Sequence, residues 1–193
     1  WEDTIMRDPS RRWLEAHRDE PFFASYLTVV PHHKYTLPES LETRSYDQQE
    51  TLNNYLNAVH YVAGFVRKLI EQYRELGLYD ETVFVILGDH GEAFGEHGLY
   101  GHNDGVYQEL ISIPWIIHDG SGETEQRVIS QRVTLLDLLP TIVDLLGFDL
   151  SGTEYPGGDA TEPLEQRRYF LSCFHDRQCL GVIEEQFKYI YQY

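Results

Sequence analysis

The 193 residues suffice for one domain with a hydrophobic core, and a hydrophobic content of 41% with 13% aromatic residues excludes a disordered chain. The formal net charge of −17 at pH 7 argues against nucleic-acid binding, because so acidic a surface repels phosphate backbones. No apolar run reaches the roughly 18–20 residues of a membrane-spanning helix, and the polar start WEDTIMRDPSRRW has no signal-peptide pattern.

The first part of the chain predicts a strand, a long helix and a second strand. Residues 21–31, PFFASYLTVVP, form a short apolar run bounded by prolines, which predicts a buried strand. From about Tyr46 to Leu76 apolar residues recur at helical spacing, and Gly77 is placed to end this helix. Residues 82–88, TVFVILG, are apolar on both faces, which predicts a strand inside a parallel sheet covered by helices. The charged residues 1–20 fit either a helix or a linker.

The second part continues with a strand and a helix and then changes character. Residues 113–120 predict a strand, and residues 134–147 predict a helix with a proline kink and a glycine stop. The order β-α-β-β-α is typical of an α/β sheet, so we expect an α/β core over residues 1–150. After the loop chemistry of residues 151–163, alternating segments predict antiparallel strands, so residues 151–193 should pack on the core as a small antiparallel sheet.

The segment GDHGEAFGEHGLYGHND, residues 88–104, follows directly on the second predicted strand and contains three histidines, two glutamates and two aspartates. In open α/β sheets, ligand sites lie at the carboxyl ends of strands, so Asp89 and His90 are placed to bind a ligand. Their oxygen and nitrogen atoms suit Mn, Zn, Fe or Mg, and Ca if more oxygen ligands join. Gly88 and Gly91 let the backbone turn sharply beside them. The alternative is that DHG is merely a turn after a buried strand.

Other histidines have weaker individual claims. His97 and His102 lie in the same segment, and His32 and His33 lie with Lys34 in the loop after the first predicted strand. If both strands are parallel members of one sheet, both loops open at the same edge and the histidines can gather around one anion. The alternative for each of them is a solvated surface side chain.

Cys173 and Cys179 are separated by five residues. A hairpin between the predicted strands would bring them together, and a disulfide would suit an exported protein. The alternative is two unpaired cysteines, and the sequence leaves both open.

Several motifs, in this order, resemble the sulfatase branch of the alkaline phosphatase superfamily. They are the helix YLNAVHYVAGFVRKLIEQYRELGLYD, the strand and loop TVFVILGDHGE, then GEHG, the helix VTLLDLLPTIVDLLG and the closing strand FKYIY. The resemblance covers most of the chain from about residue 22 to the end. It implies an α/β fold with an alkaline-phosphatase-like, mostly parallel sheet flanked by helices and a small carboxyl-terminal antiparallel sheet, truncated at the amino end.

The resemblance also implies roles for particular residues. Asp89 and His90 match ligands of one divalent metal ion, Ca, Mn, Mg or Zn. His32 and His102 match catalytic histidines, although Lys34 replaces the proline of the family pattern His-x-Pro-Tyr, so His33 and Lys34 stay as alternative substrate-binding residues. His102 stands where many sulfatases have lysine and many relatives acting on phosphoesters have histidine, which favours phosphate over sulfate.

One part of the family pattern is missing. The early nucleophile motif Cys/Ser-x-Pro-x-Arg, or its Thr variant, has no match, and Cys173 lies late in the chain in the different context CFHDR. We therefore expect the carboxyl-terminal part of a metal-dependent hydrolase acting on small-molecule, lipid or glycan sulfate or phosphate esters, inactive by itself. The alternatives are part of a membrane-anchored phosphoglycerol or phosphoethanolamine transferase-like enzyme, and a non-catalytic domain that retains the fold.

The same resemblance gives expectations for location and assembly. It favours a periplasmic, extracellular or membrane-anchored protein over a cytoplasmic one. Loss of the early strands of the family fold would expose apolar sheet surface, which favours a homo-oligomer or a rearranged amino-terminal segment that covers the gap.

Overall fold

The computed structural model describes residues 2–39, 41–122, 125–152, 154–173 and 179–192. Its backbone contacts define two compact units that alternate along the chain. The first unit comprises Trp1–Ile86, Phe94–Gly101 and Trp115–Thr124, and the second comprises Leu87–Ala93, His102–Pro114 and Glu125–Tyr193. The predicted domain boundary near residue 150 stays a prediction.

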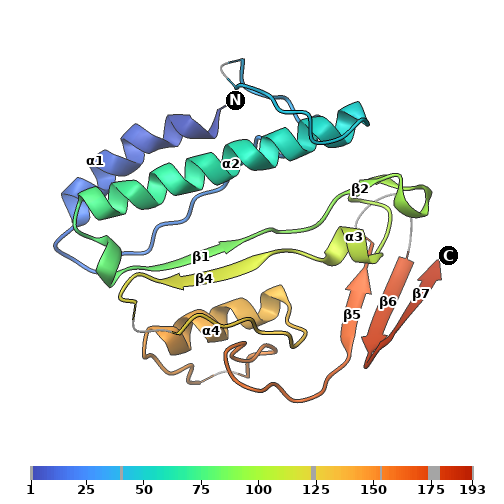
Figure 1. Ribbon diagram of the computed structural model, residues 1–193. Coiled ribbons are helices and arrows are strands. Elements are labelled where there is room, and N and C mark those ends of the chain that lie inside the picture. The colour runs from blue at the N-terminus through green and yellow to red at the C-terminus, as the bar shows by residue number, and fades with distance from the viewer. Residues whose placement is uncertain (1, 40, 123–124, 153, 174–178, 193) are drawn as a thin grey trace. The chain divides into compact units, whose positions relative to one another are not determined.

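Two helices build the core of the first unit. The 3-10 turn η1 (Asp3–Met6) leads into α1 (Arg7–His17), which lies beside the long helix α2 (Glu50–Glu75) (Figure 1). The buried apolar side chains between them are Leu14, Phe65, Leu69, Tyr73, Leu76 and Leu78. The start of the chain is therefore helical rather than a linker. Within the described residues, no helix is long and apolar enough to cross a membrane.

Helix α2 confirms the predicted helix and its glycine stop. Gly77 has a φ of +71°, a conformation that costs glycine little. The N–H of Leu78 donates to the carbonyl of Tyr73 at 2.8 Å, and the N–H of Gly77 donates to Arg74 at 3.0 Å. These two bonds satisfy the last carbonyls of the helix and end it where the sequence predicted.

The prediction of a buried strand over residues 21–31 is wrong for this structure. The segment is extended, and exposed and partly buried residues alternate along it, but it does not pair as a strand. Phe23 and Leu27 are 82% and 76% exposed. The N–H groups of Val29 and Val30 donate to the carboxylate of Asp3 at 2.9 and 3.3 Å, so a side chain takes the place of a neighbouring strand.

The strand predicted over residues 82–88 is present as β1 (Val83–Leu87), which follows the 3-10 turn η2 (Tyr79–Glu81) and pairs with β4 (Trp115–Asp119). The N–H of Gly88 donates to Pro114, and the N–H of Gly120 donates to Thr82, so this pair is antiparallel (Figure 1). All five residues of β1 are only partly buried. The expectation that β1 is buried on both faces inside a parallel sheet is therefore not met by the strand pairs described.

Short elements connect β1 to β4. They are β2 (Ala93–Phe94), the 3-10 turn η3 (Glu96–Gly98), β3 (Tyr100–Gly101) and the helix α3 (Gln108–Ile111). Strands β2 and β3 pair with each other.

The helix predicted over residues 134–147 begins as the 3-10 turn η4 (Leu135–Asp137) and continues as α4 (Leu138–Leu145). Thr134 and Asp137 form a capping box at its start. Pro140 lies in the first turn of α4, where a backbone N–H has no helical partner, so the expected proline kink is absent. Gly147, with a φ of +72°, ends the helix as predicted.

The carboxyl-terminal segments form the predicted antiparallel meander. Strands β5 (Tyr169–Ser172), β6 (Cys179–Glu184) and β7 (Phe187–Gln192) pair in chain order. A disulfide joins Cys173, directly after β5, to Cys179, the first residue of β6, and the N–H of Cys173 donates to the carbonyl of Cys179 at 3.0 Å. The alternative of two unpaired cysteines is therefore wrong.

Candidate functional site

Two loops of the second unit carry the candidate site. The DHG loop, residues 88–92, follows β1, and the His102 loop, residues 102–107, connects β3 to α3. The imidazole rings of His90 and His102 stack with their centroids 3.9 Å apart and their planes inclined by 26°. The structure thus brings together three of the predicted site residues, Asp89, His90 and His102.

The arrangement of Asp89 and His90 suits a shared cation. The ring nitrogen Nδ1 of His90 donates to the carbonyl of Gly91 at 2.9 Å, which leaves Nε2 unprotonated in the neutral ring. Nε2 lies 3.6 Å from Oδ2 of Asp89, and the two side chains are 41% and 80% exposed. Two ligands about 2.1 Å from one ion can span such a separation, and metal-bound histidines commonly donate their other N–H to a carbonyl. The donor set therefore fits a divalent metal.

His102 is held by a carboxylate that the sequence reasoning missed. Its Nδ1 lies 3.2 Å from both oxygens of Glu92, whose side chain is only 5% exposed. An ionised carboxylate can only accept, so Nδ1 is the donor in this contact and Nε2 is the other ring nitrogen. The sequence could have pointed to Glu92 through its place in the motif DHGE, three residues after Asp89. Its burial against His102, ten residues later, could be seen only in the structure.

The DHG loop needs Gly91 for a reason other than a sharp turn. Neither Gly88 nor Gly91 has a positive φ. A Cβ atom on Gly91 would lie 2.0 Å from the carbonyl oxygen of Glu109, whereas one on Gly88 would make only ordinary contacts at 3.5 Å. The N–H of Gly91 donates to the carbonyl of Leu110 at 2.8 Å. Gly91 therefore allows the loop to approach helix α3 closely, and this approach fixes His90.

The remaining predicted residues lie in the first unit. His32, His33 and Lys34 are exposed, and Nδ1 of His32 donates to the carbonyl of His33 at 2.9 Å. Tyr35, which is buried, anchors this loop through ring contacts with neighbouring aromatic residues. Because these residues belong to the other unit, their convergence on Asp89 and His90 stays a prediction.

Within the described part of the chain, no group of three or more metal-ligating side chains occurs. Among the residues described, Asp89 and His90 therefore stand as a pair, and a full coordination shell would require further ligands.

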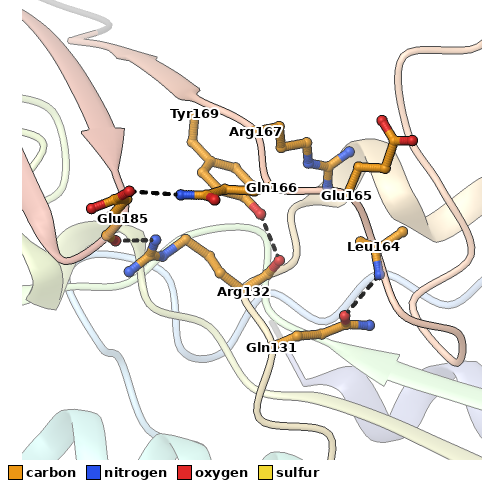
Figure 2. A pocket seen from close by; sticks show the side chains of 8 residues that line it. All are labelled: Gln131, Arg132, Leu164, Glu165, Gln166, Arg167, Tyr169 and Glu185. Carbon is orange, nitrogen blue, oxygen red and sulfur yellow. Dashed lines mark hydrogen bonds between the residues drawn. The ribbon is translucent and has the colours of Figure 1, made fainter.

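A shallow pocket of about 140 Å³ lies elsewhere in the second unit (Figure 2). Arg132 and Arg167 lie over the ring of Tyr169, with their guanidinium carbons 5.6 and 5.1 Å from its centroid. Arg132 donates to the carbonyl of Glu185, and the amide of Gln166 donates to the carboxylate of Glu185 (Figure 2). These groups bond to one another, and none of the predicted site residues lines the pocket, so we assign it no part in the site.

The family model for sulfatases matches residues 2–148, and the chain therefore belongs to the sulfatase family. The chain is 25% identical over 157 residues to a lipoteichoic acid synthase-like protein, YvgJ, of Bacillus subtilis, a match that covers 72% of this chain and 24% of that protein. It is 26% identical over 160 residues to the low-salt glycan biosynthesis sulfotransferase Agl7 of Haloferax volcanii, covering 78% of this chain and 39% of that protein.

The solved structure of a protein in the alkaline phosphatase superfamily from Vibrio parahaemolyticus superposes with a TM-score of 0.74 at 22% identity. The match covers 99% of this chain and 44% of that one. The predicted fold class, an alkaline-phosphatase-like α/β fold with a small carboxyl-terminal antiparallel sheet, is thereby confirmed. The chain spans less than half the length of each of these three proteins.

Proposed function

We propose that this chain supplies the metal-holding and proton-handling half of the active site of a sulfatase-family enzyme that hydrolyses sulfate or phosphate esters. The observation that carries the proposal is the cluster in the second unit, in which Asp89 faces Nε2 of His90 and the His90 ring stacks on His102. Asp89 and His90 would hold a divalent ion, and such an ion would supply electrophilic stabilisation of ester oxygens. Family membership supports this assignment.

Proton transfer and binding of the ester group are proposed for other residues of this chain. Glu92 fixes the proton of His102 on Nδ1, so Nε2 of His102 can accept or return a proton at the ester or leaving-group oxygen. The nearly buried carboxylate of Glu92 also holds the His102 ring in its orientation through this contact. In the first unit, His32, with His33 and Lys34 as alternatives, is proposed to bind the anionic ester group.

The chain alone is proposed to lack catalysis, because no Cys/Ser-x-Pro-x-Arg motif or Thr variant supplies a nucleophile in its sequence. The first test is therefore the purified 193-residue chain with p-nitrophenyl sulfate and bis(p-nitrophenyl) phosphate in the presence of Mn²⁺ or Ca²⁺. We expect no turnover. Hydrolysis that is abolished by Asp89→Ala would overturn this part of the proposal.

The second test uses the longer protein that contains this chain. Asp89→Ala and His102→Ala are each expected to lower hydrolysis of the preferred ester by roughly 10²–10⁴-fold, because each removes a group that stabilises the transition state. Asp19→Ala is the matched control, since that side chain is 99% exposed and lies outside the cluster. Unchanged rates in both site variants would refute the assignment of the cluster.

Transfer of a phosphoglycerol or phosphoethanolamine group to a hydroxyl acceptor is the second candidate. The observation in its favour is the similarity to the lipoteichoic acid synthase-like protein of Bacillus subtilis. The histidine at position 102 also favours phosphate in the family pattern. Adding glycerol as an acceptor separates the two reactions, because a transferase forms a glycerol phosphoester whereas a hydrolase releases only the free acid.

We also propose a location outside the cytoplasm. The disulfide between Cys173 and Cys179 supports it, because such bonds persist in oxidising compartments and are rare in the cytosol. Alkylation of thiols in freshly lysed cells tests it: two protected cysteines are expected, and two free thiols would contradict the location.

A further inference from the structure

Helix α3 and the residues that follow it hold the DHG loop in place. The N–H of Gly91 donates to Leu110 at 2.8 Å, and the N–H of Gly88 donates to Pro114 at 3.2 Å. The missing side chain of Gly91 lets the two backbones touch. The His102 loop leads directly into the first residue of α3. Both loops of the candidate site therefore depend on where α3 sits.

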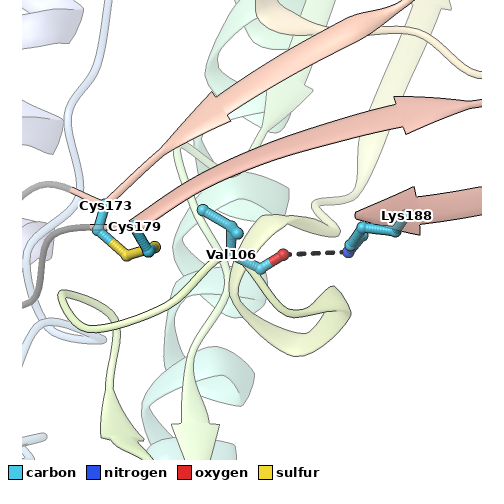
Figure 3. The surroundings of a disulfide bond; sticks show 4 residues. All are labelled: Val106, Cys173, Cys179 and Lys188. Atoms are coloured by element: carbon cyan, nitrogen blue, oxygen red, sulfur yellow. Dashed lines mark hydrogen bonds between the residues drawn. A yellow bond between two sulfur atoms is a disulfide. The ribbon is translucent and has the colours of Figure 1, made fainter. Parts of the chain in front are cut away.

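The carboxyl-terminal sheet contacts the junction between the His102 loop and α3 through hydrogen bonds and packing. The ammonium of Lys188, on β7, donates to the carbonyl of Val106 at 3.1 Å (Figure 3). It also donates to Oε1 of Gln108 at 3.2 Å. Val106 is 2% exposed. A Cβ on Gly181 of β6 would lie 3.0 Å from Cγ2 of Val106, so strand and loop are in close contact. Lys188 thus joins the end of the His102 loop to the start of α3, the helix that anchors the DHG loop.

The disulfide fixes the strand that contacts Val106. Cys179 lies two residues before Gly181 on β6, and its bond to Cys173 ties the start of β6 to the end of β5 (Figure 3). The backbone bond between the two cysteines fixes the same register. The sheet therefore presents a fixed surface to the His102 loop.

If position 188 served packing alone, a lysine there would carry an unnecessary desolvation cost for its ammonium. Burial lowers the pKa of its ammonium; Glu109 raises it and Arg132 lowers it further. The two acceptors that the ammonium binds are neutral, and a well-packed apolar side chain would avoid the cost of desolvating a charge. What the ammonium adds is geometry, because it can donate to two acceptors at once.

We infer that Lys188 is a positioning residue for the candidate site: it clamps Val106 to Gln108 and thereby sets the positions of the DHG and His102 loops. The structural part of this inference rests on contacts within the second unit. Its consequence for catalysis rests on the proposed function.

Amide hydrogen exchange in the longer protein that contains this chain tests the clamp without using activity. Lys188→Met keeps the chain length and removes both hydrogen bonds, and each lost bond changes a local opening equilibrium by a factor of roughly 5–10. We expect exchange of the amides of Gly91, Leu110 and Ser112 to rise at least about tenfold. Lys188→Arg should restore most of the protection, and Lys68→Met, on the exposed face of α2, should leave it unchanged.

A second variant keeps the test informative if Lys188→Met does not fold. Gln108 is exposed, so Gln108→Leu removes one acceptor without leaving a buried charge alone. It should raise exchange of the same amides by a smaller factor and spare helix α4. Unchanged exchange in the DHG loop, or an equal rise across α4 and the sheet, would overturn the inference.

Kinetics of ester turnover in the longer protein test the consequence of the clamp for catalysis. If the clamp positions the site, Lys188→Met lowers kcat more than it raises KM, and Lys188→Arg recovers kcat. If the longer protein turns over no ester but the exchange result holds, the proposed function fails while the clamp stands. If turnover depends on Asp89 but exchange does not respond to Lys188→Met, the clamp fails alone.

Discussion

Asp137 and Asp89 both belong to the second unit and both lie beside the end of a helix or strand, but their carboxylates have opposite surroundings. Asp137 is fully buried and accepts from the N–H of Thr134 at 2.7 Å, from the N–H of Gly158 at 2.9 Å and from the guanidinium of Arg167. Asp89 is 80% exposed at its side chain and accepts one backbone N–H, that of His90.

The difference separates a structural carboxylate from one that can bind a ligand. The donors around Asp137 occupy both of its oxygens, so it has little capacity left for a cation. Oδ2 of Asp89 instead lies 3.6 Å from Nε2 of His90, the ring nitrogen that does not bond to the carbonyl of Gly91, and we propose these two atoms as ligands of one cation. For Asp137 and Asp89, the number of hydrogen bonds to the carboxylate oxygens therefore separates a structural role from a ligand-binding one.

Asp137→Ala should have the largest effect on folding. It removes the partner of Arg167, whose side chain is 26% exposed, and leaves the N–H groups of Thr134 and Gly158 without their acceptor. Breaking a buried pair costs about 3–5 kcal/mol, and the partial exposure of Arg167 reduces this to about 2–4 kcal/mol. Urea denaturation should show this loss. A loss below about 0.5 kcal/mol, typical of surface positions, would show that the Asp137 carboxylate does not stabilise the fold.

The same pair should make stability depend on pH in the acid range. Burial raises the pKa of Asp137, but the guanidinium of Arg167 and the N–H groups of Gly158 and Thr134 outweigh it, so the pKa is lowered overall. A carboxylate with a lowered folded-state pKa stabilises the fold above its unfolded value, about 3.9, and this contribution is lost as pH falls through the folded value.

The free energy of unfolding should therefore decline below about pH 4 more steeply in the unmodified chain than in Asp137→Asn. Denaturation series between neutral pH and acid give both slopes. Asp19→Asn, with its side chain 99% exposed, is the control and should follow the unmodified chain. Equal slopes for Asp137→Asn and the unmodified chain would show that the pair does not titrate with folding.

Patterns that depend on local periodicity could be predicted from the sequence. The long helix α2 and its stop at Gly77 follow from apolar spacing and from a glycine at the right place. The antiparallel strands β5 to β7 follow from alternation. In each case the information lies within a few residues, because hydrogen bonds of a helix end or a hairpin join near neighbours.

Features that depend on distant partners could not be predicted. The apolar pattern of residues 21–31 fits a strand, yet Asp3 takes the hydrogen bonds of Val29 and Val30. The direction of β4 beside β1 depends on the path of the chain between them. For the candidate site, the pairing of Asp89 with His90 follows from their adjacency, whereas the burial of Glu92 against His102 exists only in the folded loops.

Asp89→Asn should have the smallest effect on folding and a specific effect on metal binding. Its side chain makes one local hydrogen bond, so the free energy of unfolding should change by no more than about 0.5 kcal/mol, or about 1–2 °C in Tm. A ligand that binds only the folded state raises Tm with its concentration, so Mn²⁺ or Ca²⁺ should stabilise the unmodified chain and not the variant. Asp19→Asn should respond to the ions as the unmodified chain does. If Asp89→Asn lost as much stability as Asp137→Ala in the absence of metal, the exposed carboxylate would be a structural one, and its distinction from Asp137 would fail.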